Sequence, residues 1–117
     1  MSQKDFIKEY LEIYRDLLSK DVSSEIIRLK EIMLETHSLG GKLIFAGNGA
    51  SSSIASHCAL DFSKQAKIKS LCFSDPSYIT ALSNDCGYEE WLKVALSHHL
   101  ESSDLVILIS SSGNSEN

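Results

Sequence analysis

The chain has 117 residues, which is one domain at most, and its 43% hydrophobic and 23% charged content is ordinary for a globular protein. A net charge of −5 argues against nucleic acid as the main partner, because phosphate backbones demand clustered Lys and Arg. No apolar run approaches the roughly 20 residues that span a bilayer, and the N-terminus lacks the apolar core of a signal peptide. We therefore expect a cytoplasmic protein that binds neither nucleic acid nor a membrane.

The three cysteines, Cys58, Cys72 and Cys86, share no C-x-x-C spacing. An odd number without paired spacing is typical of reduced thiols in a cytosolic protein rather than of a disulfide or zinc framework. We expect all three thiols to be unpaired and buried.

Two amphipathic helices are expected ahead of the first strand, over residues 3–19 and 22–37. Apolar side chains recur along both at three- and four-residue steps. Asp21 or Ser23 can cap the start of the second helix, and a glycine pair follows its end. The helices are long and apolar on more than one side, so they either cover the sheet or pack against another subunit.

Short apolar runs alternate with helical patterns along the rest of the chain. Strands that alternate with helices form right-handed βαβ units and a parallel sheet, and strands without apolar–polar alternation are covered on both faces. We expect an α/β fold in which residues 1–40 form a helical hairpin and residues 41–117 form the sheet-bearing part of the same domain. The expected strands span residues 43–46, 69–73 and 104–109, and the expected helices span 51–65, 76–82 and 89–100, with a turn over 83–87.

The apolar spacing also predicts which helix faces turn inward. The side chains expected to face the sheet are Ile54, Cys58 and Phe62 in the helix over 51–65, and Trp91, Val94, Ala95 and His98 in the helix over 89–100. The sequence stops at Asn117, directly after a serine-rich loop where a further helix should begin. We therefore also expect a chain that is truncated at its C-terminus.

Two serine-rich loops follow the first and third expected strands. In the first, Gly47 and Gly49 permit a tight strand-to-helix turn. Three serines, from Ser51 to Ser53, then place hydroxyls and free backbone N–H groups at a helix N-terminus, which favours an anion. The second loop is Ser110-Ser111-Ser112-Gly113-Asn114-Ser115. Ligands collect at the carboxyl ends of parallel strands, so we expect both loops on one edge, where neutral donors suit a sugar phosphate; the alternative is ordinary turn chemistry.

Neither loop carries a common nucleotide fingerprint. The chain has no G-x-x-x-x-G-K-[ST] pattern, and residues 47–52 lack the third glycine of G-x-G-x-x-G. No acidic residue stands about 20 positions further on. Dinucleotide binding is therefore disfavoured.

His57 and Asp61 stand four residues apart, so they share one face of the expected helix. A histidine and a carboxylate at this spacing can both bind a metal, or the carboxylate can move a proton. The alternative is an ordinary surface pair.

Six motifs in chain order carry a resemblance to a known family: Gly47-Asn48-Gly49-Ala50-Ser51, His57 with Asp61, Ser74-Asp75-Pro76-Ser77, Ser83-Asn84-Asp85, Gly87-Tyr88-Glu89, and the loop from Ser110 to Ser115. Together they resemble the phosphoheptose isomerases, which belong to the sugar isomerase (SIS) domain superfamily. The match spans essentially the whole chain and needs no gaps between motifs.

The resemblance implies a flavodoxin-like parallel sheet with two N-terminal helices, assembled as a homotetramer with active sites between subunits. It implies conversion of sedoheptulose 7-phosphate to the aldose heptose 7-phosphate, towards the heptoses of bacterial surface polysaccharides. By motif position, His57 and Asp61 would bind zinc, and Asp61 would also move the proton between C1 and C2. The residues implied to hold the substrate or its phosphate are Asn48, Gly49, Ala50, Ser51, Asn84, Asp85, Ser110, Ser111, Ser112 and Ser115.

The chain departs from the family pattern at four points. Asp61 stands where the family has a glutamate, and its carboxylate is one methylene shorter. Ala50 replaces a glycine, and Gln65 stands where an arginine is common. The family's remaining zinc ligands, a glutamine and a histidine on a later helix, would lie beyond Asn117.

Two functions of different classes follow. The leading hypothesis is a ketose–aldose isomerase with Asp61 as the base. The alternative is a non-catalytic SIS module that binds a sugar phosphate or a protein partner of the replication-initiator type. The departure from the family pattern at Asp61 favours this alternative. The retained His57 and the carboxylate favour the enzyme, because a pure binder needs neither.

Overall fold

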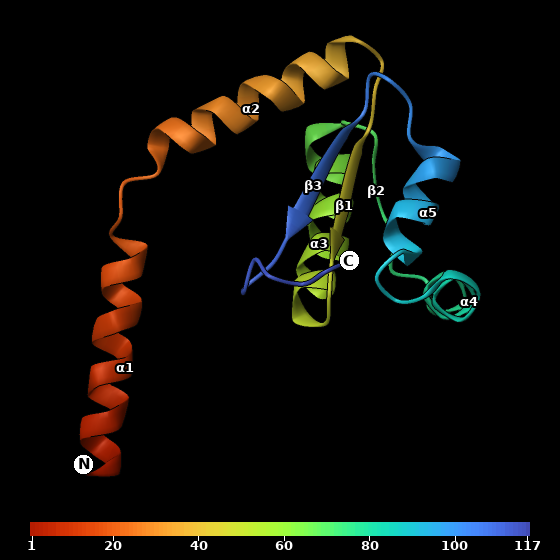
Figure 1. The fold of residues 1–117 in the computed structure, drawn as a ribbon. Helices are drawn as coiled ribbons and strands as arrows, with labels where there is room; N and C mark the ends of the chain where they lie inside the picture. The colour runs from red at the N-terminus through yellow and green to blue at the C-terminus, as the bar shows by residue number, and fades with distance from the viewer. The chain divides into compact units, whose positions relative to one another are not determined.

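The computed structural model describes residues 1–117 and forms two compact units that divide between Lys30 and Glu31. The first unit holds helix α1 (Gln3–Leu18) and the start of α2 (Ser23–Ser38). The second unit holds the end of α2 and the α/β part of the chain (Figure 1). Its elements are β1 (Leu43–Gly47), α3 (Ala50–Asp61), a π-helical turn η1 (Phe62–Ala66), β2 (Ser70–Cys72), α4 (Pro76–Cys86), α5 (Trp91–His99) and β3 (Leu105–Ile109).

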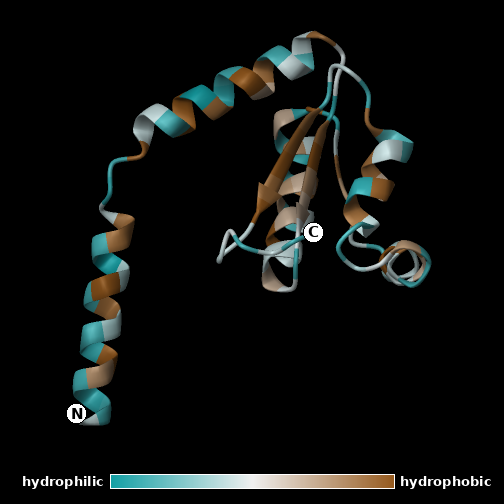
Figure 2. Cartoon of the chain, viewed as in Figure 1, coloured by the Kyte–Doolittle hydropathy of each residue, from teal (hydrophilic) through white to brown (hydrophobic).

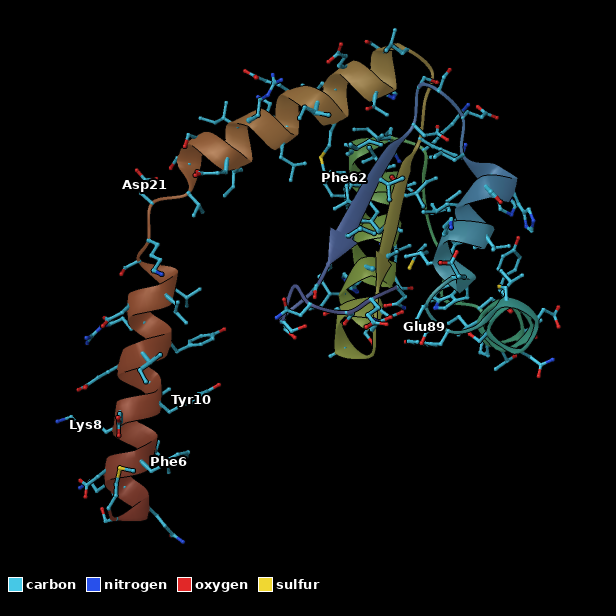
Figure 3. All side chains as sticks on the ribbon, viewed as in Figure 1. Phe6, Lys8, Tyr10, Asp21, Phe62 and Glu89 are labelled. Atoms are coloured by element: carbon cyan, nitrogen blue, oxygen red, sulfur yellow. The ribbon has the colours of Figure 1, made fainter.

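Helix α1 begins with a reciprocal cap and exposes its apolar side chains. The Ser2 hydroxyl accepts from the Asp5 N–H at 3.1 Å, and the Asp5 carboxylate accepts from the Ser2 N–H at 3.2 Å. No residue of α1 is buried, and apolar side chains such as Phe6 and Tyr10 are more than half exposed. Figure 2 shows hydrophobic residues recurring along α1, and Figure 3 shows the Phe6 and Tyr10 side chains on the helix. At the start of α2, the Asp21 carboxylate accepts from the Ser23 N–H at 3.0 Å, so Asp21 is the one of the two expected capping residues that makes this bond.

The three strands form a parallel sheet in the order β2-β1-β3, which confirms the expected parallel arrangement. Leu43 of β1 lies opposite Ser70 on one side and Leu105 on the other. The chain enters β1 through Gly41, where a Cβ would lie 2.0 Å from the Ser103 carbonyl oxygen. Glycine is therefore required at the entry to the central strand.

Both faces of β1 are covered. Leu43 and Phe45 pack with α3 residues in one core, and Ala46 packs with α5 residues in a second core. Figure 1 shows α3 on one face of the sheet and α4 with α5 on the other. The expectation of two covered faces is wrong for β3, an outer strand on which Leu108 is 65% exposed.

The buried face of α3 differs from the one that hydrophobicity predicts. Ala55 and Ala59 are buried against the sheet, Cys58 and Phe62 are partly buried, and Ile54 is 53% exposed. Small side chains let the helix backbone approach β1, so residue size determines this face. The prediction that Ile54 faces inward is wrong.

Helix α4 is longer than expected and absorbs the residues of the expected turn. Pro76 occupies its first turn, and Asp75 caps it by accepting from the Ser77 N–H at 2.9 Å. The helix continues through Asn84 and Asp85 to Cys86 and ends at Gly87, whose φ is 91°. Ser, Asn and Asp carry only a modest helix penalty, which packing of α4 against α5 overrides.

Two smaller expectations also need correction. All three cysteines are unpaired as expected, but Cys86 is exposed, whereas Cys58 and Cys72 are partly buried. Burial raises the pKa of the Cys72 thiol. His98 is exposed rather than packed on the sheet, while Leu92 is buried.

No helix of the structure combines the length and apolar character needed to cross a membrane.

Candidate functional site

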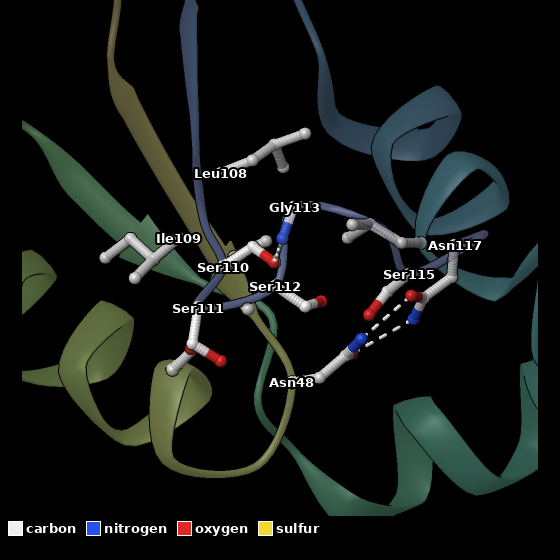
Figure 4. Close-up of a pocket in the computed structure, with 13 residues that line it drawn as sticks. Asn48, Leu108, Ile109, Ser110, Ser111, Ser112, Gly113, Ser115 and Asn117 are labelled. Carbon is white, nitrogen blue, oxygen red and sulfur yellow. Dashed lines mark hydrogen bonds between the residues drawn. The ribbon is translucent and has the colours of Figure 1, made fainter.

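A cavity of about 290 Å³ opens at the carboxyl ends of β1 and β3 (Figure 4). The two strands are hydrogen-bonded neighbours, so the loops that follow them meet at one edge as expected. The lining residues are Ala46, Gly47, Asn48, Ser51, Leu92, Leu108, Ile109, Ser110, Ser111, Ser112, Gly113, Ser115 and Asn117. None of their side chains carries a charge, so these side chains offer hydroxyl and amide groups alone.

Gly47 brings the two walls of this cavity together. A Cβ at this position would lie 2.7 Å from the Ser51 carbonyl group and 2.9 Å from the Ile109 carbonyl oxygen. The first turn of α3 therefore packs against the end of β3 only because residue 47 has no side chain. Gly49, the N-cap of α3, adopts φ 55° and ψ −123°, a conformation for which glycine is suited.

The start of α3 is more closed than the sequence suggests. The N–H of Ser51 donates to the Asn48 carbonyl at 3.0 Å, and those of Ser52 and Ser53 donate to the Gly49 carbonyl at 3.0 and 3.2 Å. The expectation of free backbone N–H groups on these three serines is therefore wrong. What the first loop offers the cavity is the Ser51 side chain and the positive end of the helix dipole.

The second loop uses two of its serine hydroxyls as acceptors. Ser110 Oγ accepts from the Gly113 N–H at 2.9 Å, and Ser112 Oγ accepts from the Asn114 N–H at 3.2 Å. A serine hydroxyl that accepts one hydrogen bond still has its own O–H to donate. These turns therefore fix two hydroxyls beside the cavity in positions from which they can donate to an anionic ligand.

An amide network closes one wall of the cavity, and the sequence did not predict it. Asn48 Nδ2 donates to Asn117 Oδ1 at 2.8 Å, and Asn117 Nδ2 donates to Asn48 Oδ1 at 3.0 Å. The Tyr88 hydroxyl also donates to Asn48 Oδ1, at 3.1 Å. Asn48 was singled out, but Tyr88 and Asn117 were not. The motif Gly87-Tyr88-Glu89 was the one signal that could have pointed to Tyr88.

His57 and Asp61 share one face of α3 as expected, with Nε2 and Oδ2 3.3 Å apart. Their side chains are 73% and 53% exposed. His57 lines a separate hollow on the outer face of α3, together with Gly49 and Leu60. In this chain the two residues thus form an exposed pair, whose interaction contributes at most about 1 kcal/mol.

Six of the residues expected in the site do not line the serine-rich cavity: Gly49, Ala50, His57, Asp61, Asn84 and Asp85. Asp61 ends α3 ten residues after Ser51, which is about 15 Å along a helix axis. Asn84 and Asp85 lie in the last turn of α4, where the Asn84 amide donates to the Asp85 carboxylate at 3.3 Å. The structure of one chain therefore brings together the serine loops and Asn48, but not the carboxylates.

The metal expectation can be tested against the available donors. Catalytic zinc takes three protein ligands, usually His, Cys, Asp or Glu. The structure contains no group of three such residues that could hold a metal ion. His57 and Asp61 supply two donors, so residues 1–117 do not by themselves fit a zinc site.

The most buried ion pair lies at the opposite, amino-terminal edge of the sheet. The Asp104 side chain is fully buried and accepts from Lys42 Nζ at 2.5 Å, from the Lys42 N–H at 2.9 Å and from the Glu101 N–H at 2.8 Å. Burial alone would raise the pKa of Asp104, but these hydrogen bonds outweigh it and lower that pKa below its usual range. This pair joins the entry of β1 to the entry of β3.

Comparison with known proteins places this architecture among relatives. The family model of the SIS domain matches residues 5–117. The phosphoheptose isomerase of Helicobacter pylori strain P12 is 32% identical over 123 residues, covering 100% of this chain and 60% of the relative. That of Trichlorobacter lovleyi is also 32% identical, covering 97% of this chain and 63% of the relative.

Solved structures agree with the sequence comparison. The structure of the phosphoheptose isomerase GmhA from Neisseria gonorrhoeae matches with a TM-score of 0.86 at 26% identity, over 98% of this chain and 64% of that one. A phosphoheptose isomerase from Francisella tularensis matches with a TM-score of 0.85 at 26% identity, over 100% and 66%. The chain thus spans about 60% of the length of the curated relatives named above.

Proposed function

The chain belongs to the SIS domain family. We propose that it is part of a ketose–aldose isomerase whose substrate is sedoheptulose 7-phosphate. The observation that carries the proposal is the single neutral cavity to which two serine-rich loops contribute at the ends of adjacent parallel strands. The named relatives, all phosphoheptose isomerases, support the same substrate class. They do not favour the alternative of a non-catalytic module.

We assign the phosphate to the serine loops. Ser51, Ser110, Ser111, Ser112 and Ser115 all line the cavity and carry hydroxyl donors. The positive end of the α3 dipole, at Ala50 and Gly49, favours the anion there. Asn48 then meets the sugar through its side-chain amide, and Asn84 with Asp85 would contact the sugar hydroxyls.

The chemistry needs one base. A carboxylate takes a proton from C1 of the ketose while C2=O becomes C2–OH, which gives an enediol. Return of the proton to C2, with loss of the proton from the C1 hydroxyl, gives the aldose. We assign the base to Asp61, which is exposed and stands at the end of α3.

Asp61 lies about 15 Å along the helix axis from Ser51, which is too far for one chain to use both on one sugar phosphate. We therefore propose that copies of the chain assemble, as a homotetramer, so that each site combines groups of two subunits. The exposed apolar side chains of α1 support assembly, because a helix with such a stripe gains by covering it. Residues 1–40 would then serve the contact between copies.

For zinc, we propose only which residues of this chain would bind it. His57 and Asp61 would be this chain's share of a zinc site that other residues complete, and bound zinc would supply a Lewis acid for the developing oxyanion. The three unpaired cysteines support a reducing compartment, so we propose the cytoplasm as the location.

The test is turnover of sedoheptulose 7-phosphate by the intact protein, followed by ¹H NMR in D₂O. We expect the aldose to form with deuterium at C2. Asp61→Asn should abolish turnover while the Kd of the sugar phosphate changes less than threefold. Asp61→Glu should raise kcat, because the longer side chain reaches closer to the reacting carbon.

Exposed Glu101→Gln, outside both the cavity and residues 1–40, is the control and should leave turnover unchanged. Undiminished turnover in Asp61→Asn would remove Asp61 as the base. A wild-type protein that binds the sugar phosphate without converting it would favour the non-catalytic module.

A further inference from the structure

Tyr88 connects a distant part of the chain to the wall of the serine-lined cavity. It lies in the segment between α4 and α5, and its hydroxyl donates to Asn48 Oδ1 at 3.1 Å. The two residues are 40 positions apart, and Asn48 directly follows β1. This contact is a side-chain hydrogen bond from the α4–α5 segment to a cavity residue.

The backbone around Tyr88 is shaped for this contact. Gly87 ends α4 with φ 91° and ψ 151°, a conformation that side chains rarely adopt. Its N–H donates to the Ser83 carbonyl at 3.0 Å, and its carbonyl accepts from the Glu90 N–H at 3.2 Å. Tyr88 therefore projects from a hydrogen-bonded turn that is anchored at the end of a helix.

The contact determines how the Asn48 amide is used. Its Oδ1 accepts from Tyr88 and from Asn117, and its Nδ2 donates to Asn117 Oδ1 at 2.8 Å. With the Tyr88 hydroxyl donating to the oxygen, the nitrogen is the atom that Asn48 presents to an acceptor. Figure 4 shows the Asn48 and Asn117 amides facing each other beside Ser115. Asn117 Oδ1 thus occupies a place that a ligand oxygen can take.

We propose that Tyr88 is a positioning residue for sugar-phosphate binding. It holds the Asn48 side chain so that Nδ2 donates to an oxygen of the substrate, which displaces the Asn117 amide. The inference rests on the proposed function for its ligand, and it assigns Tyr88 a role through Asn48 rather than a contact with the reacting atoms.

Tyr88→Phe removes the hydroxyl and keeps the ring. We expect the Kd of sedoheptulose 7-phosphate to rise about threefold to tenfold, which is the range for loss of one hydrogen bond, with the melting temperature unchanged. In an Asn48→Ala background the same substitution should change the Kd less than twofold, because coupled residues are non-additive. Tyr78→Phe is the matched control, since its hydroxyl bonds His99 at 2.9 Å outside the cavity.

A second readout needs no substrate. In ¹H–¹⁵N spectra, the Asn48 side-chain amide signals should shift in Tyr88→Phe and stay in place in Tyr78→Phe. Equal losses of affinity in both backgrounds, or an Asn48 amide that does not respond to Tyr88→Phe, would overturn the inference. If the Asn48 amide signals shift in Tyr88→Phe but the wild-type protein does not bind the sugar phosphate, the positioning of Asn48 by Tyr88 is supported and the proposed function is rejected.

Discussion

Single residues decide how closely the two walls of the cavity approach. Gly47 is the clearest case, because the backbone of α3 and the end of β3 both lie within 3 Å of the position that a Cβ would take. Backbone atoms cannot swing away as a flexible side chain can. The cavity therefore depends on the absence of one methyl group.

Gly47→Ala should lower the free energy of unfolding by about 1–3 kcal/mol, the range for overpacking a tight site. It should also weaken sugar-phosphate binding, because the Ser51 and Ser110 loops must move apart. Urea unfolding and calorimetric titration measure the two effects. Exposed Ser53→Ala on α3 is the control and should stay within about 0.5 kcal/mol of the wild type. Wild-type stability in Gly47→Ala would contradict the packing described.

Asp104 makes stability depend on pH. The fold lowers the pKa of this carboxyl, so its contribution is present above the ordinary Asp value of about 3.9 and is lost as the pH falls through the lowered pKa. Asp104→Asn also leaves Lys42, whose side chain is 19% exposed, without its closest anion.

We expect Asp104→Asn to cost about 2–4 kcal/mol at pH 7 and less at pH 3, measured by urea unfolding at both values. Asp16→Asn, at an exposed pair with Arg15, should cost less than about 0.5 kcal/mol at either pH. An equal cost of Asp104→Asn at both pH values would show that the carboxylate charge is not what stabilises the fold.

At the scale of elements, α3 is the helix whose two faces are most easily confused. Alanines at 55 and 59 make its contact with the sheet, while Ile54 and Leu60 are more than half exposed. The exposed face, with Ile54 and Leu60, therefore carries larger hydrophobic side chains than the buried face.

Ala55→Leu should therefore destabilise the protein by about 1–3 kcal/mol, because the site has no room for three more carbons. Ile54→Ala, one position away, should change stability by less than about 1 kcal/mol, since Ile54 is already more than half exposed. Thermal unfolding of the two variants gives the comparison. The reverse order would restore the face that hydrophobicity predicts.

The sequence predicted the elements better than their contacts. The apolar runs at Leu43 and Leu105 identified β1 and β3, and the parallel sheet placed their two loops on one edge. The end of α4 was missed because the helix penalties of Ser83, Asn84 and Asp85 are small beside its packing on α5. The bond between Tyr88 and Asn48 was missed because no local pattern pairs residues 40 apart.

At the scale of the whole molecule, the notable feature is that α1 has no buried residue and that its apolar side chains are exposed. Phe6, Tyr10, Leu11 and Leu17 are each more than half exposed. Exposed apolar stripes of this kind mark contacts between proteins. This feature supports the proposed assembly of copies of the chain.

Tyr10→Glu together with Leu17→Glu should reduce the molar mass measured by light scattering and should abolish turnover, while the far-ultraviolet circular dichroism of the protein stays native. Lys8→Glu, whose side chain is 77% exposed, is the control for added negative charge on α1. A double variant that keeps its mass would show that α1 does not hold the copies together.

We propose above that the two serine loops hold the phosphate of a sugar phosphate. The most direct measurement is a titration of the ¹⁵N-labelled protein with sedoheptulose 7-phosphate, read by the backbone amide signals. We predict saturable shifts concentrated in residues 48–53 and 110–115. Shifts concentrated instead around Lys42 and Lys69, which line a hollow at the opposite edge of the sheet, would contradict the claim.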